Sequence, residues 1–185
     1  MDAAEFVATA ARCTRCALSA TRQRVVVGAG PWHAAIALVG EAPGRHEDES
    51  GEPFVGRSGQ LLFALLRDEA GLAREDCYVT SVVKCRPPNN RTPTRGELAA
   101  CRPWWLQQRE LFDVRVIVTL GNTATKAVLE VNEPISALRG RVYTPTSGPP
   151  VVPTFHPAAA VRNGKRVAEL MRADFALVAT LLAAS

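Results

Sequence analysis

The chain has 185 residues, 47% of them hydrophobic and 22% charged, and a net charge of +4 with a pI near 9.0 gives it a mild basic bias. These values are ordinary for one globular domain with a sizeable core, and they allow a polyanionic partner without demanding one. A membrane-spanning chain is excluded, because no stretch approaches the roughly 20 apolar residues of a span. A signal peptide is not expected either, because residues 1–11 carry acids where a signal peptide carries basic residues. We therefore expect a single domain over residues 1–185, a cytoplasmic monomer that does not bind membranes and whose cysteines stay reduced.

Apolar strands alternate with helices along the chain. A short amphipathic helix at 3–12 precedes a buried strand at 35–40, and a long glycine-rich loop at 41–57 follows. In the later part of the chain, strands are predicted at 77–83, 114–120 and 151–155. Helices are predicted at 58–70, from 94 through the tryptophans, at 122–131 and at 165–183. Thr94 and Glu97 form a capping box for the helix through the tryptophans, although Pro103 should bend or interrupt it. This alternation predicts a mostly parallel sheet covered by helices on both faces.

Four segments with polar or unusual residues follow the predicted strands directly, at 40–57, 84–92, 121–123 and 156–163. Ligands of parallel α/β sheets bind beyond the carboxyl ends of the strands. We therefore expect these four segments to meet at one functional site.

The five cysteines form an uneven set. Cys13 and Cys16 make a C-x-x-C pair, Cys85 and Cys101 lie far downstream with fifteen residues between them, and Cys77 falls inside a strand pattern. The pair ends a helix instead of following a strand, which argues against a thioredoxin-like redox motif, and a zinc ribbon would need a second close pair. Four cysteines from distant segments suit an iron–sulfur cluster. A cluster, a zinc site and plain burial all stay open on the residues alone.

The glycine-rich stretch GEAPGRHEDESGEPFVGRSGQLL, residues 40–62, is neither a Walker loop nor a dinucleotide fingerprint. Its glycines let backbone amides approach a ligand closely, and the helix that starts at Ser58 offers donors to a phosphate. Phe54 has little reason to lie in a polar loop as a core residue, whereas a platform for stacking a base would explain it. The alternative is an irregular acidic surface loop.

His156 comes straight after the last predicted strand, in TFHPAAAVRNGKR, where Pro157 restricts the loop. A lone histidine is more often a surface or core residue than a catalyst. The basic residues that follow, Arg162, Lys165 and Arg166, suit contact with a DNA backbone.

Four stretches together resemble the iron–sulfur uracil-DNA glycosylases of family 4. They are the C-x-x-C start with ATRQRVVVGAG, the glycine-rich stretch above, VVKCRPPNNRTPT and PTFHPAAAVRN. The resemblance spans nearly the whole chain and implies a three-layer α/β/α sandwich around a central, mostly parallel four-stranded sheet. It also implies a [4Fe–4S] cluster held by Cys13, Cys16, Cys85 and Cys101, with Cys77 as a core residue.

The resemblance further implies a monofunctional glycosylase that hydrolyses the N-glycosidic bond of uracil, and of other deaminated bases, in single- or double-stranded DNA. Such an enzyme extrudes the base before cleavage and initiates base excision repair. The implied catalytic residues are His156, which stabilises the leaving base, Glu41, which positions water, and Glu47 and Asn90. The implied base-binding residues are Gly40, Ala42, Pro43, Gly44, Phe54 and Ser81, and the implied DNA-binding residues are Lys84, Arg86, Arg91, Arg162, Asn163 and Lys165.

Ser81 is a departure from the family pattern, which reads Asn at this position. The amide that pairs with the uracil edge is thereby replaced by one rotating hydroxyl on a shorter arm. We expect weaker uracil excision and room for a bulkier base, unless main chain and water restore the contact.

Two alternative functions compete with the glycosylase. One is a non-catalytic or covalently trapping uracil-DNA binder, but residues 84–94 hold no histidine of the kind that trapping relatives carry there. The other is an iron–sulfur accessory module of another DNA enzyme, which would keep its cluster and release no base.

Overall fold

The structure is a computed structural model that describes residues 2–184. Its centre is a sheet of four strands, all parallel, in the order β2-β1-β3-β4. The strands are β1 (Ile36–Gly40), β2 (Cys77–Ser81), β3 (Val116–Leu120) and β4 (Val151–Thr154). Every residue in them is buried, as expected for a parallel sheet with both faces covered.

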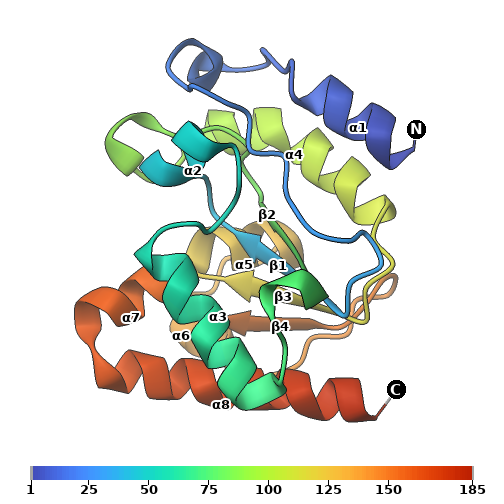
Figure 1. The fold of residues 1–185 in the computed structure, drawn as a ribbon, viewed down its shortest axis with the longest axis vertical. Coiled ribbons are helices and arrows are strands. Elements are labelled where there is room, and N and C mark those ends of the chain that lie inside the picture. Colours follow the sequence, from blue (N-terminus) through green and yellow to red (C-terminus); the bar gives the residue numbers. More distant parts are fainter. Residues whose placement is uncertain (1, 185) are drawn as a thin grey trace.

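Helices cover both faces of this sheet, so the fold has three layers (Figure 1). One face packs against α3 (Arg57–Ala70), α7 (Pro157–Asn163) and α8 (Lys165–Ala183), which supply Leu62, Leu66 and Phe175 to the core. The other face packs against α1 (Ala3–Ala10), α4 (Arg95–Glu110) and α5 (Asn122–Leu129), with Phe6 and Trp105 at its centre. The predicted three-layer α/β/α sandwich is confirmed.

Short helices complete the fold in the connections. These are α2 (Arg45–Ser50), α6 (Ile135–Leu138) and the 3₁₀ turns η1 (Ala17–Ala20), η2 (Arg74–Asp76) and η3 (Pro88–Asn90). No helix within residues 2–184 is long and apolar enough to cross a membrane.

Three local predictions differ from the structure. The loop predicted at 41–57 contains α2, and the basic segment after His156 is the helix α7. The helix α4 is not interrupted at Pro103 but continues through it. Its missing N–H leaves the carbonyl of Ala99 unpaired, but both residues lie on the exposed face of α4, where water can satisfy that carbonyl.

The predicted capping box of α4 is confirmed: the Thr94 hydroxyl accepts from the Glu97 N–H, and the Glu97 carboxylate accepts from the Thr94 N–H.

Other parts of the chain pair with both outer edges of the sheet, at one residue each. Beside β2, Ala29 and Val79 exchange backbone hydrogen bonds of 2.9 and 2.7 Å, and beside β4, Tyr143 and Val151 exchange bonds of 2.9 and 2.8 Å. The backbone groups of Val151 therefore point outward. Those of Pro153, two residues further on, do so as well, and its missing N–H costs the sheet no hydrogen bond.

Candidate functional site

A cavity of about 720 Å³ lies beyond the carboxyl ends of the strands and brings together all four of the strand-end segments. Predicted site residues that line it are Glu41, Ala42, Pro43, Gly44, Glu47, Phe54, Ser81, Asn90, Arg91, His156 and Arg162. A second cavity, of about 550 Å³ between α4 and α5, is lined by none of the predicted residues. The larger cavity is therefore the candidate site.

Phe54 forms one wall of the cavity in an unusual backbone conformation. Its φ is +54°, a region that residues other than glycine seldom adopt. Its ring lies over Gly40, where an added Cβ would come within 2.8 Å of it, and a Cβ on Gly59 would meet the Phe54 carbonyl oxygen at 1.7 Å. The two glycines thus let the strained loop close, and the ring faces His156 at 5.7 Å between centroids with the planes 32° apart.

His156 stands at the first turn of α7 as its N-cap. Its Nδ1 accepts a hydrogen bond of 3.1 Å from the backbone N–H of Ala158. Burial, with a smaller contribution from Arg162, lowers the pKa of His156 to about 4. At neutral pH the ring is therefore uncharged, and its single N–H is on Nε2, because Nδ1 is the acceptor.

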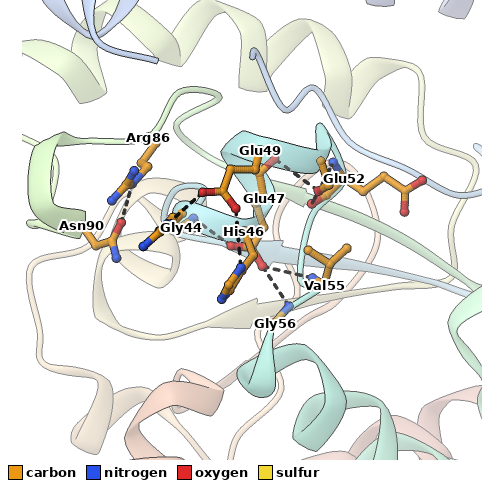
Figure 2. Close-up of polar contacts among 11 residues, drawn as sticks. Gly44, His46, Glu47, Glu49, Glu52, Val55, Gly56, Arg86 and Asn90 are labelled. Carbon is orange, nitrogen blue, oxygen red and sulfur yellow. Dashed lines mark hydrogen bonds and ion pairs between the residues drawn. The ribbon is translucent and has the colours of Figure 1, made fainter. Parts of the chain in front are cut away.

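Glu47 joins two walls of the cavity through backbone hydrogen bonds (Figure 2). One carboxylate oxygen accepts from Val55 N at 3.0 Å and Gly56 N at 3.2 Å, and the other accepts from Gly44 N at 3.1 Å. These contacts hold α2 against the loop that carries Phe54. Both oxygens of Glu47 are thus engaged in shaping the cavity.

Two further polar predictions, Glu41 and Asn90, sit at the cavity with partners of their own. The hydroxyl of Thr123, at the start of α5, donates to the Glu41 carboxylate. Asn90 has a left-handed φ of +54°, and its Oδ1 accepts from Arg86 Nε at 2.7 Å (Figure 2). The Asn90 amide nitrogen has no protein partner among the described residues, so it can donate into the cavity.

Lys84, predicted to contact phosphate, lies inside the protein instead. It is 1% exposed, and its Nζ donates to Thr80 Oγ1 at 2.7 Å, to the Ser81 carbonyl at 2.6 Å and to Gln108 Oε1. Burial lowers its pKa to about 7. The prediction was wrong because the chain remains in the protein interior past the end of β2, so Lys84 points inward and cannot reach DNA.

The other predicted phosphate contacts lie at or near the surface. Arg91 holds Glu97 with two bonds, of 2.7 and 2.8 Å, and this contact is the main reason that the pKa of Glu97 is lowered to about 2. Arg162, Asn163 and Lys165 are exposed on α7 and at the start of α8. Of these three residues, Arg162 lines the cavity together with His156.

The four cysteines of the predicted cluster line one small cavity between the N-terminal segment and α4. Three of the sulfurs accept N–H donors: Cys13 from Trp104 Nε1 at 3.1 Å, Cys101 from Lys84 N at 3.3 Å and Cys85 from Arg22 Nη1 at 3.5 Å. Within residues 2–184, no three cysteine, histidine or acidic side chains are grouped to hold a single metal ion. A [4Fe–4S] cluster has a different requirement, because each of its four cysteines binds a separate iron.

Cys77 is separate from this group. It is fully buried in β2, its thiol contacts the carbonyl of Ala73 at 3.3 Å, and burial raises its pKa to about 12. It therefore stays protonated inside the core.

Gly121 and Asn122 line the site, although no role was predicted for either. Gly121 has a φ of +91°, and a Cβ on it would lie 2.9 Å from the Cβ of His156. The sequence shows a glycine between a predicted strand and a predicted helix. That glycine indicates close packing against another segment, but the sequence does not say that this segment carries His156.

Comparisons with known proteins show the family of the chain. Residues 27–178 match the Uracil DNA glycosylase superfamily. The type-4 uracil-DNA glycosylase of Thermotoga maritima is 49% identical over 153 residues, covering 82% of this chain and 79% of that protein. Those of Saccharolobus solfataricus and Archaeoglobus fulgidus are each 40% identical, covering 95% and 91% of this chain and 84% and 87% of their own lengths. The chain belongs to the uracil DNA glycosylase superfamily.

Proposed function

We propose that this protein hydrolyses the N-glycosidic bond of uracil in DNA and so initiates base excision repair. The observation that carries the proposal is the uncharged His156, whose Nε2–H is left to donate into a cavity walled by Phe54. The three relatives described above are named type-4 uracil-DNA glycosylases, which supports the same reaction. A non-catalytic binder or accessory module is not favoured by these relatives.

The reaction needs the target nucleotide outside the DNA stack, where the protein can reach the bond. As the bond breaks, positive charge develops on the sugar and negative charge on the departing base. His156 would donate its Nε2 proton in a hydrogen bond to a uracil carbonyl oxygen. A neutral donor that is already oriented stabilises the developing anion without reorganising in the transition state.

The cavity walls would select the base by shape and stacking. Phe54 would stack on the ring, and the backbone from Gly40 to Gly44, with Ala42 and Pro43, would border its edge. Ser81 would face the edge that distinguishes uracil from cytosine. Its single hydroxyl offers less discrimination than an amide would.

Two polar side chains at the cavity, Glu41 and Asn90, would organise the attacking water, and a third, Glu47, would keep the cavity in shape. Glu41, held by Thr123, is the group we propose to position that water at the sugar. Glu47 would act through the loop that it holds, as a positioning residue. The free amide nitrogen of Asn90 would donate to substrate or water. No proton has to move through Glu47.

DNA would be held by side chains around the cavity mouth. Arg86, Arg91, Arg162, Asn163 and Lys165 are the residues proposed to contact phosphate. Such contacts set register and affinity and carry no base information. Both single- and double-stranded DNA are proposed as substrates.

A [4Fe–4S] cluster fits the four grouped cysteines, whose N–H···S contacts are of the kind that surround such clusters. Cys13, Cys16, Cys85 and Cys101 would be its ligands. Burial raises the pKa of Cys85 to about 11, and a bound cationic centre would favour the thiolate there. When bound, the cluster would supply structural order, by joining the N-terminal segment to residues 85–101.

The test is a base-release assay on single- and double-stranded oligonucleotides that contain uracil, hypoxanthine or xanthine. We expect release of free uracil and an abasic site, with no strand break until alkali is added. Iron-loaded protein that binds uracil-containing DNA but releases no base would reject the glycosylase and favour the binder.

A further inference from the structure

The helix α2 forms part of the candidate site but has almost no hydrophobic attachment to the fold. It has six residues, and its only buried residue is an acid, Asp48, which is 1% exposed. A helix this short is not stable on its own. Its position must therefore come from polar contacts, and Asp48 is the residue that points inward.

Asp48 is fastened to the segment that follows the C-x-x-C pair. Its Oδ1 accepts from the backbone N–H of Gln23 at 2.9 Å and from that of Arg24 at 3.3 Å. The neighbouring Arg22 in turn donates to the Cys13 carbonyl at 2.6 Å and to the Cys85 sulfur at 3.5 Å. These hydrogen bonds therefore connect α2 to the cysteine group through residues 22–24.

The residue before Asp48 in α2 contacts different segments of the chain. Glu47 accepts from Gly44 on one wall of the cavity and from Val55 and Gly56 on the other (Figure 2). Val55 follows Phe54 directly in the chain. A shift of α2 therefore moves the ring that faces His156.

We infer that Asp48 is a positioning residue of the base pocket. Its hydrogen bonds form a joint, a contact through which the N-terminal segment with Cys13 and Cys16 positions α2. The hydrogen bonds of Glu47 in turn position Phe54. This inference rests on the proposed function for its catalytic consequence. The joint works through one acceptor oxygen and does not need the negative charge, because both of its donors are neutral backbone amides.

The experiment compares wild type with Asp48→Ala, Asp48→Asn and a matched control, Glu49→Gln, which changes an exposed acid on the same helix. Each iron-loaded protein is assayed for single-turnover uracil release with enzyme in excess, for affinity toward the same oligonucleotide, and for amide hydrogen exchange. Because a displacement of about 1 Å can cost up to about 100-fold in rate, we expect Asp48→Ala to slow release by about 10- to 100-fold with little loss of DNA affinity. Asp48→Asn keeps the acceptor oxygen and should stay within about threefold of wild type, as should Glu49→Gln.

Hydrogen exchange separates this inference from the proposed function. Asp48→Ala should exchange faster at residues 44–56, while Asp48→Asn should not, whether or not the protein releases uracil. Wild type that releases no base would reject the proposed function and leave the exchange result to decide the joint. Unchanged rate and exchange in Asp48→Ala, or equal damage in both Asp48 variants, would overturn the inference.

A second variant covers the case in which Asp48→Ala loses its iron. Gln23→Pro deletes one of the two N–H donors and leaves α2 untouched. Loss of one hydrogen bond predicts a smaller decrease, of about three- to tenfold in rate. A wild-type rate and wild-type exchange at residues 44–56 in that variant would overturn the inference.

Discussion

The imidazole of His156 accepts a hydrogen bond at Nδ1 from the backbone N–H of Ala158, 3.1 Å away. This contact selects one tautomer and leaves Nε2–H as the only donor of the ring. If that donor stabilises the leaving base, His156→Ala should lower the single-turnover rate by about 10²–10³-fold. His33→Ala, at an exposed histidine, is the control. DNA affinity should hardly change, and an unaltered rate in His156→Ala would leave the residue as a helix cap only.

The pH dependence of uracil release follows from the lowered pKa of His156, which is about 4. The active form is the neutral ring, so the rate should not depend on this group between about pH 5 and 8 and should fall as the pH approaches 4. For stability the sign is the same: the unfolded chain, with a histidine pKa near 6.5, binds the proton more readily. The contribution of His156 is complete above about pH 6.5 and is lost as the pH falls to 4. An inflection of the rate near pH 6.5 that disappears in His156→Gln would contradict the neutral ring.

The cysteine group predicts the metal content of the protein. Anaerobically purified protein should be brown and contain about four iron atoms per chain. Cys85→Ser should lose the colour and unfold at a lower temperature, whereas Cys77→Ser should keep the colour because Cys77 lies apart from the group. Stoichiometric zinc without iron, measured on a careful anaerobic preparation, would refute the cluster.

The position of Ser81 predicts a gain of activity. The residue ends β2, is 5% exposed and lines the cavity. The resemblance to the family 4 glycosylases implies Asn at this position. An amide would add a second polar contact to uracil, so Ser81→Asn should raise the uracil rate by about tenfold, with less release of hypoxanthine or xanthine relative to uracil. Equal or slower uracil release would show that Ser81 is already compensated by the main chain and water.

The burial of Lys84 and the exposure of Arg162 predict different salt dependences of DNA binding. Arg162→Ala should reduce the slope of log K against log salt by about 1, as expected for one lost phosphate contact. Lys84→Met should leave the slope unchanged and lower stability instead, since Thr80 and Gln108 lose their shared partner. A reduced slope for Lys84→Met would contradict the interior position of Lys84.

Period and turn patterns were sufficient to predict the alternation of strands and helices, the parallel sheet and the segments that surround the cavity. They were not sufficient for α2 and α7, because neither has a hydrophobic stripe long enough to read. Lys84 was misplaced for a related reason: its inward position depends on Gln108, 24 residues away, whose Oε1 accepts a hydrogen bond from Nζ. Phe54 was recognised because a large aromatic residue in an acidic loop is conspicuous, but its strained φ and its dependence on Gly40 and Gly59 are properties of the folded chain.

Ala29 beside β2 and Pro153 within β4 also affect whether the sheet edges can cause aggregation when this protein refolds at high concentration. A bare edge strand offers a row of free N–H and C=O groups onto which a strand of another molecule can add. Here Ala29 pairs with the middle of one edge strand and Tyr143 with the start of the other, and Pro153 offers an incoming strand no donor. We therefore expect concentrated refolding to proceed without aggregates built by extension of this sheet.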